Sequence, residues 1–296
     1  MTYKPDRNTE DQKVKIIETP RDGFQGLKNI IPTRNKIDYL NRLLKAGFDT
    51  VEIGSFVSPK TVPQMADTED VLSGLDLSEP HSRIMVLAGN TTGGLKAASS
   101  KMVDYILYPF SFSPTFLKRN LNTDRESSKK TIRELKHICK SYHKELIVYL
   151  TMAFGNPYGD PWSPLMVADW AGFLISEGMK ILPLSDIMGD VTPATIRSVY
   201  TLLNKEYPQT EFGIHLHCKP GDHYEKVNAA WDCGIRRFDT VLDGFGGCPF
   251  ASDHMVSNLD TRALMGFLEE KGIDPGINKT ELAKAGEELD KLIIKD

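Results

Sequence analysis

The stretch MKILPLSDIMGDVTPATIRSVYTLLNKEYPQTEFGIHLH, residues 179–217, contains two apolar runs separated by a helical segment. The runs at 179–184 and 211–216 have the length and composition of buried strands. Between them, Thr192-Pro193 has the form of a helix cap followed by a first-turn proline. A strand, a helix and a second strand in this order predict a parallel βαβ unit.

The same alternation continues in both directions along the chain. Further strands are predicted at 14–18, 50–54, 83–88, 103–108, 146–151 and 236–242. Helix signals separate them: caps at Thr33, Asp124 and Ser163-Pro164, and stops at Gly47, Gly178 and Gly234. Strands and helices alternating over roughly 250 residues have the dimensions of a TIM barrel.

The predicted fold is therefore α/β, a single (β/α)8 TIM barrel over about 14–272 with an additional C-terminal helix at about 279–294. A doubly wound open sheet is the alternative, but no Gly-x-Gly-x-x-Gly follows the first strand. No linker, repeat or low-complexity stretch interrupts the chain. Residues 1–296 are accordingly expected to form one catalytic domain.

Composition excludes several classes of function. The formal charge is −4, and no basic stripe interleaved with aromatic residues predicts a nucleic-acid surface. The four cysteines, Cys139, Cys218, Cys233 and Cys248, lack paired spacing, which favours a reducing compartment over a disulfide framework. The N-terminal residues are polar, and the longest apolar run, 146–154, is too short to cross a bilayer. We expect a soluble, cytoplasmic protein that binds neither membranes nor nucleic acid.

In a TIM barrel the active site lies at the carboxyl ends of the strands, so polar residues at those ends are candidates for chemistry. Pro20-Arg21-Asp22-Gly23 follows the first strand. Asp22 would serve as a hard oxygen ligand or a general base, and Arg21 as a cation for a developing oxyanion. The alternative is a surface turn, because Asp-Gly is a common turn pair.

Two further carboxylates belong to predicted strands. Glu52 lies inside an apolar run, where a buried acid is costly unless it is paired, and Arg21 is a plausible partner. A structural salt bridge toward the helix layer is the alternative for Glu52. Asp186 ends the sixth strand and would orient or deprotonate a substrate hydroxyl, or else simply cap its loop.

The seventh and eighth strands supply possible metal ligands and a thiol. His215 and His217 are two residues apart, so on a strand both imidazoles point to one side. The glycine-rich loop 244–249 carries Cys248, which suits a mobile lid that delivers a proton donor or nucleophile; free cysteine is otherwise often a small buried residue. Asn258 offers an oxygen ligand or a helix cap.

Together, Asp22, His215, His217 and Asn258 would offer two oxygens and two nitrogens to a metal. This mixed donor set suits Mg²⁺, Mn²⁺, Fe²⁺ or Zn²⁺ without choosing among them. Of the other cysteines, Cys139 and Cys233 fall on predicted helices and are interpreted as structural, while Cys218 directly follows the histidines and stays ambiguous.

From about residue 15 to 277 the chain resembles the 3-hydroxy-3-methylglutaryl-CoA lyases, within the metal-dependent TIM-barrel lyases that also include isopropylmalate and homocitrate synthases. The stretches that carry the resemblance are ETPRDGFQGLKNIIPT (18–33), EIGSFVSPKTVPQM (52–65), GNPYGD (155–160), GIHLH (213–217), GFGGCPF (244–250) and SNLDT (257–261). The SFVSPKxVPQM and GFGGCP motifs are specific to the lyase branch, because the related condensing enzymes lack the cysteine loop.

The resemblance implies cleavage of 3-hydroxy-3-methylglutaryl-CoA to acetyl-CoA and acetoacetate, as in leucine degradation and ketone-body formation. It makes Asp22, His215, His217 and Asn258 the ligands of a divalent cation, with Mg²⁺ or Mn²⁺ expected and Zn²⁺ as an alternative. The remaining implied roles are Arg21 as oxyanion stabiliser, Cys248 as lid acid, Asp186, Glu52 and His215 in proton handling or orientation, and Gln25 and Ser55 as substrate contacts.

The sequence departs from the family pattern at Ile147, Pro183, Ser185 and Cys218. The first three replace an arginine, a serine and a glycine, and Cys218 stands where an aspartate is usual. Alternatives are therefore a lyase for another 3-hydroxyacyl-CoA, a Claisen-condensing enzyme that uses a 2-oxo acid and acetyl-CoA, an iron oxygenase and a non-enzymatic acyl-CoA-binding paralogue. The expected partner is a small acyl-CoA, and a homo-oligomer, a dimer, is the expected assembly.

Overall fold

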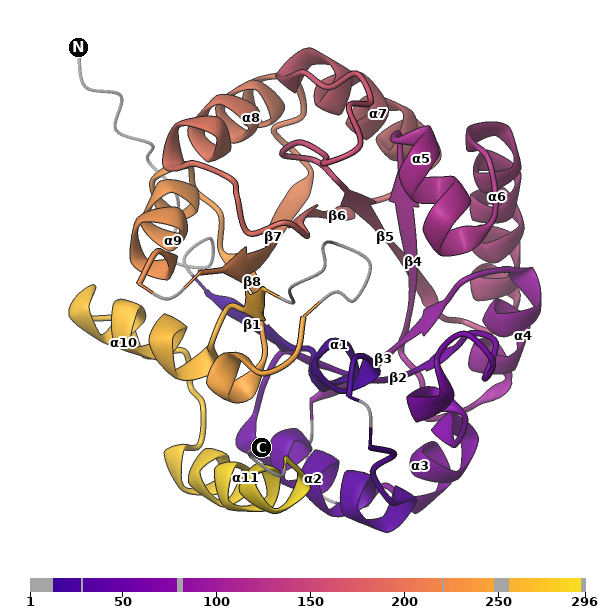
Figure 1. Ribbon diagram of the computed structural model, residues 1–296, viewed down its shortest axis with the longest axis vertical. Coiled ribbons are helices and arrows are strands. Elements are labelled where there is room, and N and C mark those ends of the chain that lie inside the picture. Colours follow the sequence, from indigo (N-terminus) through magenta and orange to yellow (C-terminus); the bar gives the residue numbers. More distant parts are fainter. Residues whose placement is uncertain (1–12, 28, 79–81, 220, 248–255, 294–296) are drawn as a thin grey trace.

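The computed structural model describes residues 13–27, 29–78, 82–219, 221–247 and 256–293, and its centre is a closed barrel of parallel strands (Figure 1). The barrel strands are β1 (Lys15–Glu18), β2 (Thr50–Phe56), β3 (Arg83–Ala88), β4 (Tyr105–Ser111), β5 (Glu145–Thr151), β6 (Ile181–Asp186), β7 (Glu211–Cys218) and β8 (Arg237–Thr240). Each pairs in parallel with the next, and β8 pairs with β1 to close the barrel. The predicted TIM barrel is confirmed, and every predicted strand overlaps an observed one.

Helices surround the barrel, and α11 packs against α2 beside it (Figure 1). The longer helices are α2 (Thr33–Ala46), α3 (Thr68–Gly74), α4 (Thr91–Ser99), α6 (Arg125–Ser141), α7 (Pro164–Ser176), α8 (Pro193–Glu206), α9 (His223–Asp232), α10 (Thr261–Glu270) and α11 (Lys279–Leu292). The short elements are α1 (Pro20–Gln25), η2 (Pro63–Met65), α5 (Pro114–Phe116), η3 (Leu117–Leu121), η4 (Leu242–Gly244) and the strand β9 (Ser257–Asn258). Among the described residues, no helix has both the length and the apolarity of a membrane span.

The caps explain where several of these helices begin. Asp124, Ser163 and Thr192 each accept a hydrogen bond from a backbone N–H in the first turn, as predicted. The prediction for Thr33 was wrong. Pro32 occupies the cap position of α2, and the Thr33 hydroxyl instead donates to Asp67 Oδ2 at 2.7 Å, which ties α2 to the segment before α3.

Side-chain alternation along the strands separates two apolar layers. Leu216, between the two histidines, is buried in the core between sheet and helices. A second cluster fills the barrel interior and contains Ile17, Met85, Leu87, Tyr105, Leu107, Ile147 and Tyr149. Because alternate residues of a strand face opposite sides, a polar residue at an interior position points toward the barrel axis. The interior is packed, so it can hold polar side chains in fixed positions.

Buried Glu18 joins three elements at the end of β1. Its carboxylate accepts hydrogen bonds from the backbone N–H of Leu242 at 2.7 Å and from the hydroxyls of Thr240 at 3.1 Å and Thr261 at 2.6 Å. Burial raises the pKa of Glu18 to about 8, although these hydrogen bonds act in the opposite direction. The carboxyl group therefore links β1, the end of β8 and α10, and its contribution to stability depends on pH.

We expect the substitution Glu18→Gln to change how the free energy of unfolding depends on pH. The folded-state pKa is raised, so the native protein retains a proton that the unfolded chain releases as pH rises from about 4.5 to about 8. The stability of the wild type should fall relative to Glu18→Gln over this range. Urea unfolding of both proteins at pH 5 and pH 8 measures the difference. A difference in unfolding free energy that is the same at both pH values would contradict this reading.

Candidate metal centre and active site

The segment after β1 is a short buried helix. Pro20 begins α1, and the Asp22 backbone N–H donates to Thr19 O at 3.0 Å, which folds the chain back over the barrel mouth. Arg21 and Asp22 are both buried. The surface-turn alternative for the Arg-Asp-Gly segment is therefore wrong, and both charged side chains belong to the interior of the rim.

Arg21 is held by three side chains. Its Nε donates to Glu52 Oε1 at 2.7 Å, and its Nη1 donates to Gln25 Oε1 at 3.0 Å and to Asp22 Oδ1 at 3.2 Å. Burial opposes the charge, but Glu52 and Asp22 outweigh it and raise the pKa of Arg21. The pairing of Glu52 with Arg21 that the sequence predicted is confirmed. A guanidinium fixed at two of its nitrogens is an immobile positive charge.

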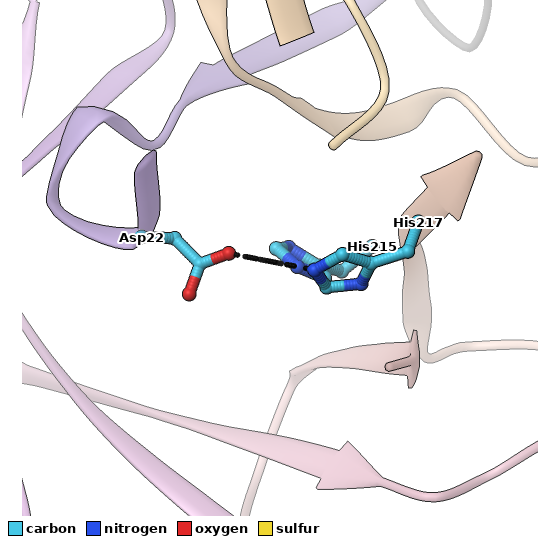
Figure 2. Close-up of side chains that lie close together, drawn as sticks. All are labelled: Asp22, His215 and His217. Atoms are coloured by element: carbon cyan, nitrogen blue, oxygen red, sulfur yellow. Dashed lines mark ion pairs between the residues drawn. The ribbon is translucent and has the colours of Figure 1, made fainter. Parts of the chain in front are cut away.

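His215 and His217 project from β7 toward Asp22 on α1 (Figure 2). The Nε2 atoms of both histidines lie 3.7 Å from Asp22 Oδ2. Ligands of one ion with bonds of about 2.1 Å lie about 3 Å apart when adjacent and about 4.2 Å apart when opposite. The three side chains come from elements distant in sequence. Their donor atoms are nonetheless separated by distances expected for ligands of one shared ion.

Asn258 reaches the same place by an unexpected route. It lies on β9, which pairs antiparallel with the end of β7 so that Asn258 stands opposite His217. Paired residues of neighbouring strands project to the same face. The helix-cap alternative for Asn258 is wrong, because Asp260 caps α10. The side-chain Nδ2 of Asn258 donates to Phe245 O at 3.1 Å, which leaves the amide oxygen to face elsewhere.

The donor atoms themselves supply the test for a metal. Asp22 Oδ2, His217 Nε2 and Asn258 Oδ1 are buried and have no hydrogen-bond partner among the described residues. A buried polar atom without a partner costs about 1–3 kcal/mol, so three in one place are unfavourable unless something binds them. One divalent cation would satisfy all three, and this donor set fits a hard or borderline ion.

The protonation states of His217 and Asp22 suit the same use. Burial lowers the pKa of His217 to about 4, so its imidazole is neutral and keeps a lone pair for a ligand bond. Burial alone would raise the pKa of Asp22, but the charges of Arg21 and His215 outweigh it and hold this pKa below the ordinary value. A neutral imidazole beside an ionised carboxylate is the form that binds a cation.

These side chains open into a cavity of about 360 Å³. Its polar end is formed by Arg21, Asp22, Glu52, His215 and His217, together with Gln25, whose amide donates to Asp22 Oδ1. The remaining wall is largely apolar and includes Val57, Leu87, Leu107, Phe116, Leu121 and Ile187. A pocket with a few convergent polar groups at one end and an apolar wall is typical of a small-molecule site.

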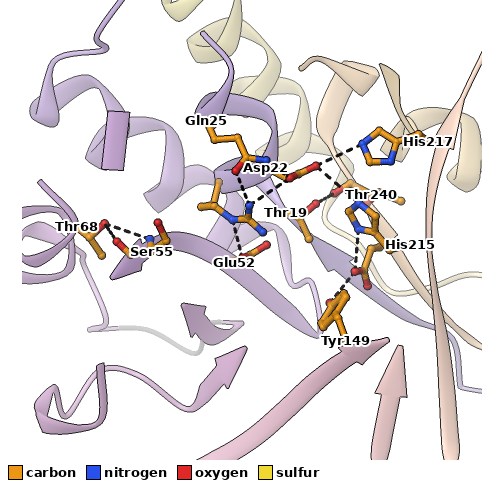
Figure 3. Close-up of polar contacts among 12 residues, drawn as sticks. Thr19, Asp22, Gln25, Glu52, Ser55, Thr68, Tyr149, His215, His217 and Thr240 are labelled. Carbon is orange, nitrogen blue, oxygen red and sulfur yellow. Dashed lines mark hydrogen bonds and ion pairs between the residues drawn. The ribbon is translucent and has the colours of Figure 1, made fainter. Parts of the chain in front are cut away.

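Of the predicted site residues that the structure describes, Asn258, Ser55 and Asp186 lie outside this lining, and the last two are not among the candidate metal ligands. The backbone of Ser55 pairs with the Thr68 hydroxyl (Figure 3). Ser55 contributes to a neighbouring pocket of about 280 Å³. Asp186 accepts hydrogen bonds from the backbone N–H groups of Met188 at 3.1 Å and Val191 at 3.3 Å. Burial raises the pKa of Asp186 to about 6. Its carboxylate caps the loop after β6, which is the alternative left open by the sequence, and the substrate roles of both residues stay predictions.

The predicted acid Cys248 lies outside the described residues, but the chain just before it lies against the candidate metal site. Phe245 packs on the Phe24 ring with centroids 5.3 Å apart. Gly246 has φ +73°, and a Cβ at this position would lie 2.2 Å from Gly23 O. Only glycine fits so close an approach, which brings the loop onto α1 next to Asp22.

Sequence reasoning missed two polar residues of the site. Asp239 on β8 stands beside His215 in the register of the sheet and lies 3.2 Å from its Nδ1. Tyr149 on β5 lines the cavity and donates from its hydroxyl to Asp239 at 2.6 Å. The sequence did contain a signal for Asp239. It is an acid inside the predicted strand 236–242, and a buried acid in a strand is costly unless it is paired, as for Glu52. A tyrosine in an apolar strand gives no such signal.

The chain matches a known protein family and is similar to curated proteins. The family model described as HMGL-like matches residues 13–289. The mitochondrial hydroxymethylglutaryl-CoA lyase of Mus musculus is 34% identical over 94% of this chain and 85% of that protein. The cytoplasmic 3-hydroxy-3-methylglutaryl-CoA lyase of Homo sapiens is 31% identical over 95% of this chain and 76% of that protein.

Solved structures give the same result. An HMG-CoA lyase from Brucella melitensis superposes with a TM-score of 0.87 at 31% identity, covering 95% of this chain and 99% of that one. The HMG-CoA lyase from Acinetobacter baumannii in complex with coenzyme A and 3-methylmalate gives a TM-score of 0.88 at 28% identity, covering 97% and 93%. With the family model matching nearly the whole barrel, this chain belongs to the HMGL-like family.

Proposed function

We propose that this protein is a divalent-metal-dependent carbon–carbon lyase that cleaves 3-hydroxy-3-methylglutaryl-CoA to acetyl-CoA and acetoacetate. The observation that carries the proposal is the convergence of three unsatisfied donor atoms, on Asp22, His217 and Asn258, beside a fixed arginine at the end of a cavity. Relatives in the family are named for this activity. The reaction needs a hydroxyl proton removed, a carbon–carbon bond broken and a thioester enolate protonated.

Asp22, His215, His217 and Asn258 would hold the ion. The carboxylate and amide oxygens favour Mg²⁺ or Mn²⁺, while the two imidazoles also accept Zn²⁺. A bound divalent cation lowers the pKa of a coordinated hydroxyl and fixes the geometry of the oxygens around it. The four side chains come from α1, β7 and β9, so the barrel holds them in place before any ligand arrives.

Arg21 supplies the positive charge for the enolate. As the carbon–carbon bond breaks, negative charge develops on the thioester oxygen, and a fixed guanidinium stabilises it without having to move. Glu52 and Gln25 hold that guanidinium in the cavity wall. Glu52 therefore acts first as the residue that orients Arg21.

The proton of the substrate hydroxyl needs a separate base. His215 was one candidate, but a Nε2 lone pair that ligates an ion cannot also accept a proton. Asp186 was the other candidate, and its carboxylate is occupied by loop N–H groups. Glu52 lines the cavity, and burial outweighs the effect of Arg21 and raises its pKa, which makes it a stronger base than a surface carboxylate. We assign the proton to Glu52 and the protonation of the enolate carbon to Cys248.

The open side of the cavity suits the coenzyme A portion of the substrate. Arg119 and Asn122, on and after the π-helical turn η3, are exposed and line this side. The Arg119 guanidinium lies 4.9 Å from the centroid of the Tyr158 ring. Coenzyme A carries several phosphates, and an exposed cation at the rim would attract them.

Arg119→Ala is expected to raise KM for the acyl-CoA about fivefold while leaving kcat unchanged, because a surface ion pair contributes about 1 kcal/mol to binding. The effect should weaken at high ionic strength. Lys101→Ala is the control, since Lys101 is an exposed cation that does not line the cavity. Steady-state kinetics at low and high salt would refute the assignment if the two variants had the same KM.

The activity is tested by incubating the protein with 3-hydroxy-3-methylglutaryl-CoA and Mg²⁺ or Mn²⁺, with and without a chelator, and measuring acetoacetate. Product that appears with the ion and disappears with the chelator supports the proposal. Absence of metal-dependent product would refute this substrate assignment. Parallel assays with other 3-hydroxyacyl-CoAs, and with 2-oxo acids plus acetyl-CoA, identify a related lyase or a condensing enzyme.

A further inference from the structure

Both histidines of the proposed metal site have their Nδ1 atoms occupied and their Nε2 atoms turned toward Asp22. His217 Nδ1 lies 2.8 Å from the backbone oxygen of Asp186. His215 Nδ1 lies 3.2 Å from Asp239 Oδ2. The backbone oxygen can only accept a hydrogen bond, so His217 carries its proton on Nδ1 and keeps Nε2 bare. For His215, the side chain of Asp239 would hold the proton on Nδ1 in the same way and leave Nε2 bare.

Tyr149 completes this second arrangement. Its hydroxyl reaches from β5 to the carboxylate of Asp239 on β8, so the contact crosses the barrel interior between non-adjacent strands (Figure 3). A phenol is protonated at neutral pH and donates to a carboxylate. Asp239 Oδ2 therefore lies between two donors, and it accepts from both Tyr149 and His215.

We infer that Tyr149 and Asp239 are positioning residues that fix the tautomer and the ring orientation of His215 for metal binding. With its proton held on Nδ1 by Asp239, His215 presents the lone pair of Nε2 to the ion. Tyr149 in turn restricts rotation of the Asp239 carboxylate. This inference rests on the metal site of the proposed function and adds two residues to it.

A merely structural role explains the arrangement less well. Asp239 is a buried carboxylate in the barrel interior, where a charge is costly unless it is used. The other carboxylate oxygen, Oδ1, has no hydrogen-bond partner among the described residues. The side-chain hydrogen bonds of Asp239 in the described structure are therefore those that Oδ2 accepts from Tyr149 and His215. A carboxylate that orients a metal-ligating histidine is a recurring arrangement, and loss of it weakens metal affinity about 10–100-fold.

The test measures Mn²⁺ affinity of the full-length chain by electron paramagnetic resonance of the free ion. Asp239→Asn is expected to weaken Mn²⁺ binding about 10–100-fold, because a neutral amide lacks the carboxylate charge that strengthens the hydrogen bond from the Nδ1–H of His215. Tyr149→Phe leaves the acceptor for His215 but frees it to rotate, and should weaken binding about two- to tenfold. Saturating Mn²⁺ should restore most of kcat in both variants, since neither residue is assigned to the reacting atoms.

Tyr200→Phe is the matched control. The Tyr200 hydroxyl donates to Gly213 O on β7 at 2.7 Å and Tyr200 is also buried, but no contact joins it to His215. Tyr200→Phe should lose a similar amount of stability to Tyr149→Phe and keep wild-type Mn²⁺ affinity. Comparison of the three variants separates loss of a buried hydrogen bond from loss of histidine orientation.

Long-range ¹H–¹⁵N spectra of the metal-free protein at alkaline pH report the tautomer directly. We expect the proton of His215 on Nδ1 in the wild type and a shift toward Nε2–H in Asp239→Asn. Wild-type tautomer and wild-type Mn²⁺ affinity in both Asp239→Asn and Tyr149→Phe would overturn the inference. If the unmodified protein binds no Mn²⁺, the metal site of the proposed function fails instead, so the two failures are distinguishable.

Discussion

Arg21→Met is expected to lower kcat about 10²–10³-fold, which is the usual cost of removing one fixed group that stabilises an oxyanion. The guanidinium is the charge in the cavity wall that Glu52 and Gln25 hold in place, and methionine keeps its bulk without the charge. Arg21→Lys keeps a charge but loses the second hydrogen-bonding arm, so its kcat should fall between those of Arg21→Met and the wild type.

Arg21 also neutralises two buried carboxylates, so a control must separate catalysis from metal binding. Mn²⁺ affinity and the urea midpoint are measured for each variant, and kcat is compared only at saturating Mn²⁺. Added guanidinium should partly restore the rate of Arg21→Met by occupying the vacated space. A kcat within a few-fold of wild type in Arg21→Met at saturating ion would remove the oxyanion role.

Cys248→Ala is expected to lower kcat about 10²–10⁴-fold, the range for loss of a positioned general acid. The thiol is assigned to protonate the enolate carbon after the carbon–carbon bond breaks. It is outside the proposed donor set, so Mn²⁺ affinity should stay at the wild-type value, and the KM for substrate should change little.

Cys233→Ala is the control for this thiol. Cys233 is half-buried at the end of α9, outside the lining of the cavity, and its loss should leave kcat unchanged. Single-turnover measurements distinguish the steps: in Cys248→Ala the acyl-CoA should bind normally and the product form slowly. If Cys248→Ala and Cys233→Ala had the same kcat, the acid would have to be another group.

Much of the barrel follows from local signals in the sequence. Each buried strand is a short apolar run, and Asp124, Ser163 and Thr192 cap their helices as their residue types predict. These features depend on a few neighbouring residues, which is why they can be read locally. Thr33 differs because a tertiary partner, Asp67, competes for its hydroxyl. The chain then begins the helix one residue earlier, after Pro32.

The site was predictable where its residues lie at strand ends. Once the barrel is assumed, Arg21, Asp22, His215 and His217 fall at one rim, and the structure brings them together. Asn258 reaches the rim through β9, an antiparallel strand of two residues that the (β/α)8 pattern does not contain. Such a strand is too short to leave a periodic signal.

Side-chain contacts across the barrel could not be predicted from the sequence. Tyr149 and Asp239 are 90 residues apart on non-adjacent strands, and their contact depends on the tilt and register of the whole barrel. Asp186 shows the opposite case, because a strand-end carboxylate in the expected place accepts from its own loop. Position at the rim predicts which side chains can reach the site, and packing decides which of them do.

The most direct test of the proposed metal site is the anomalous scattering of Mn²⁺ in crystals of the wild-type protein. We predict one strong site within bonding distance of Asp22 Oδ2, His215 Nε2, His217 Nε2 and Asn258 Oδ1, and its loss in crystals of Asp22→Ala. Crystals that bind no Mn²⁺ at this point, or bind it away from the two histidines, would contradict the account.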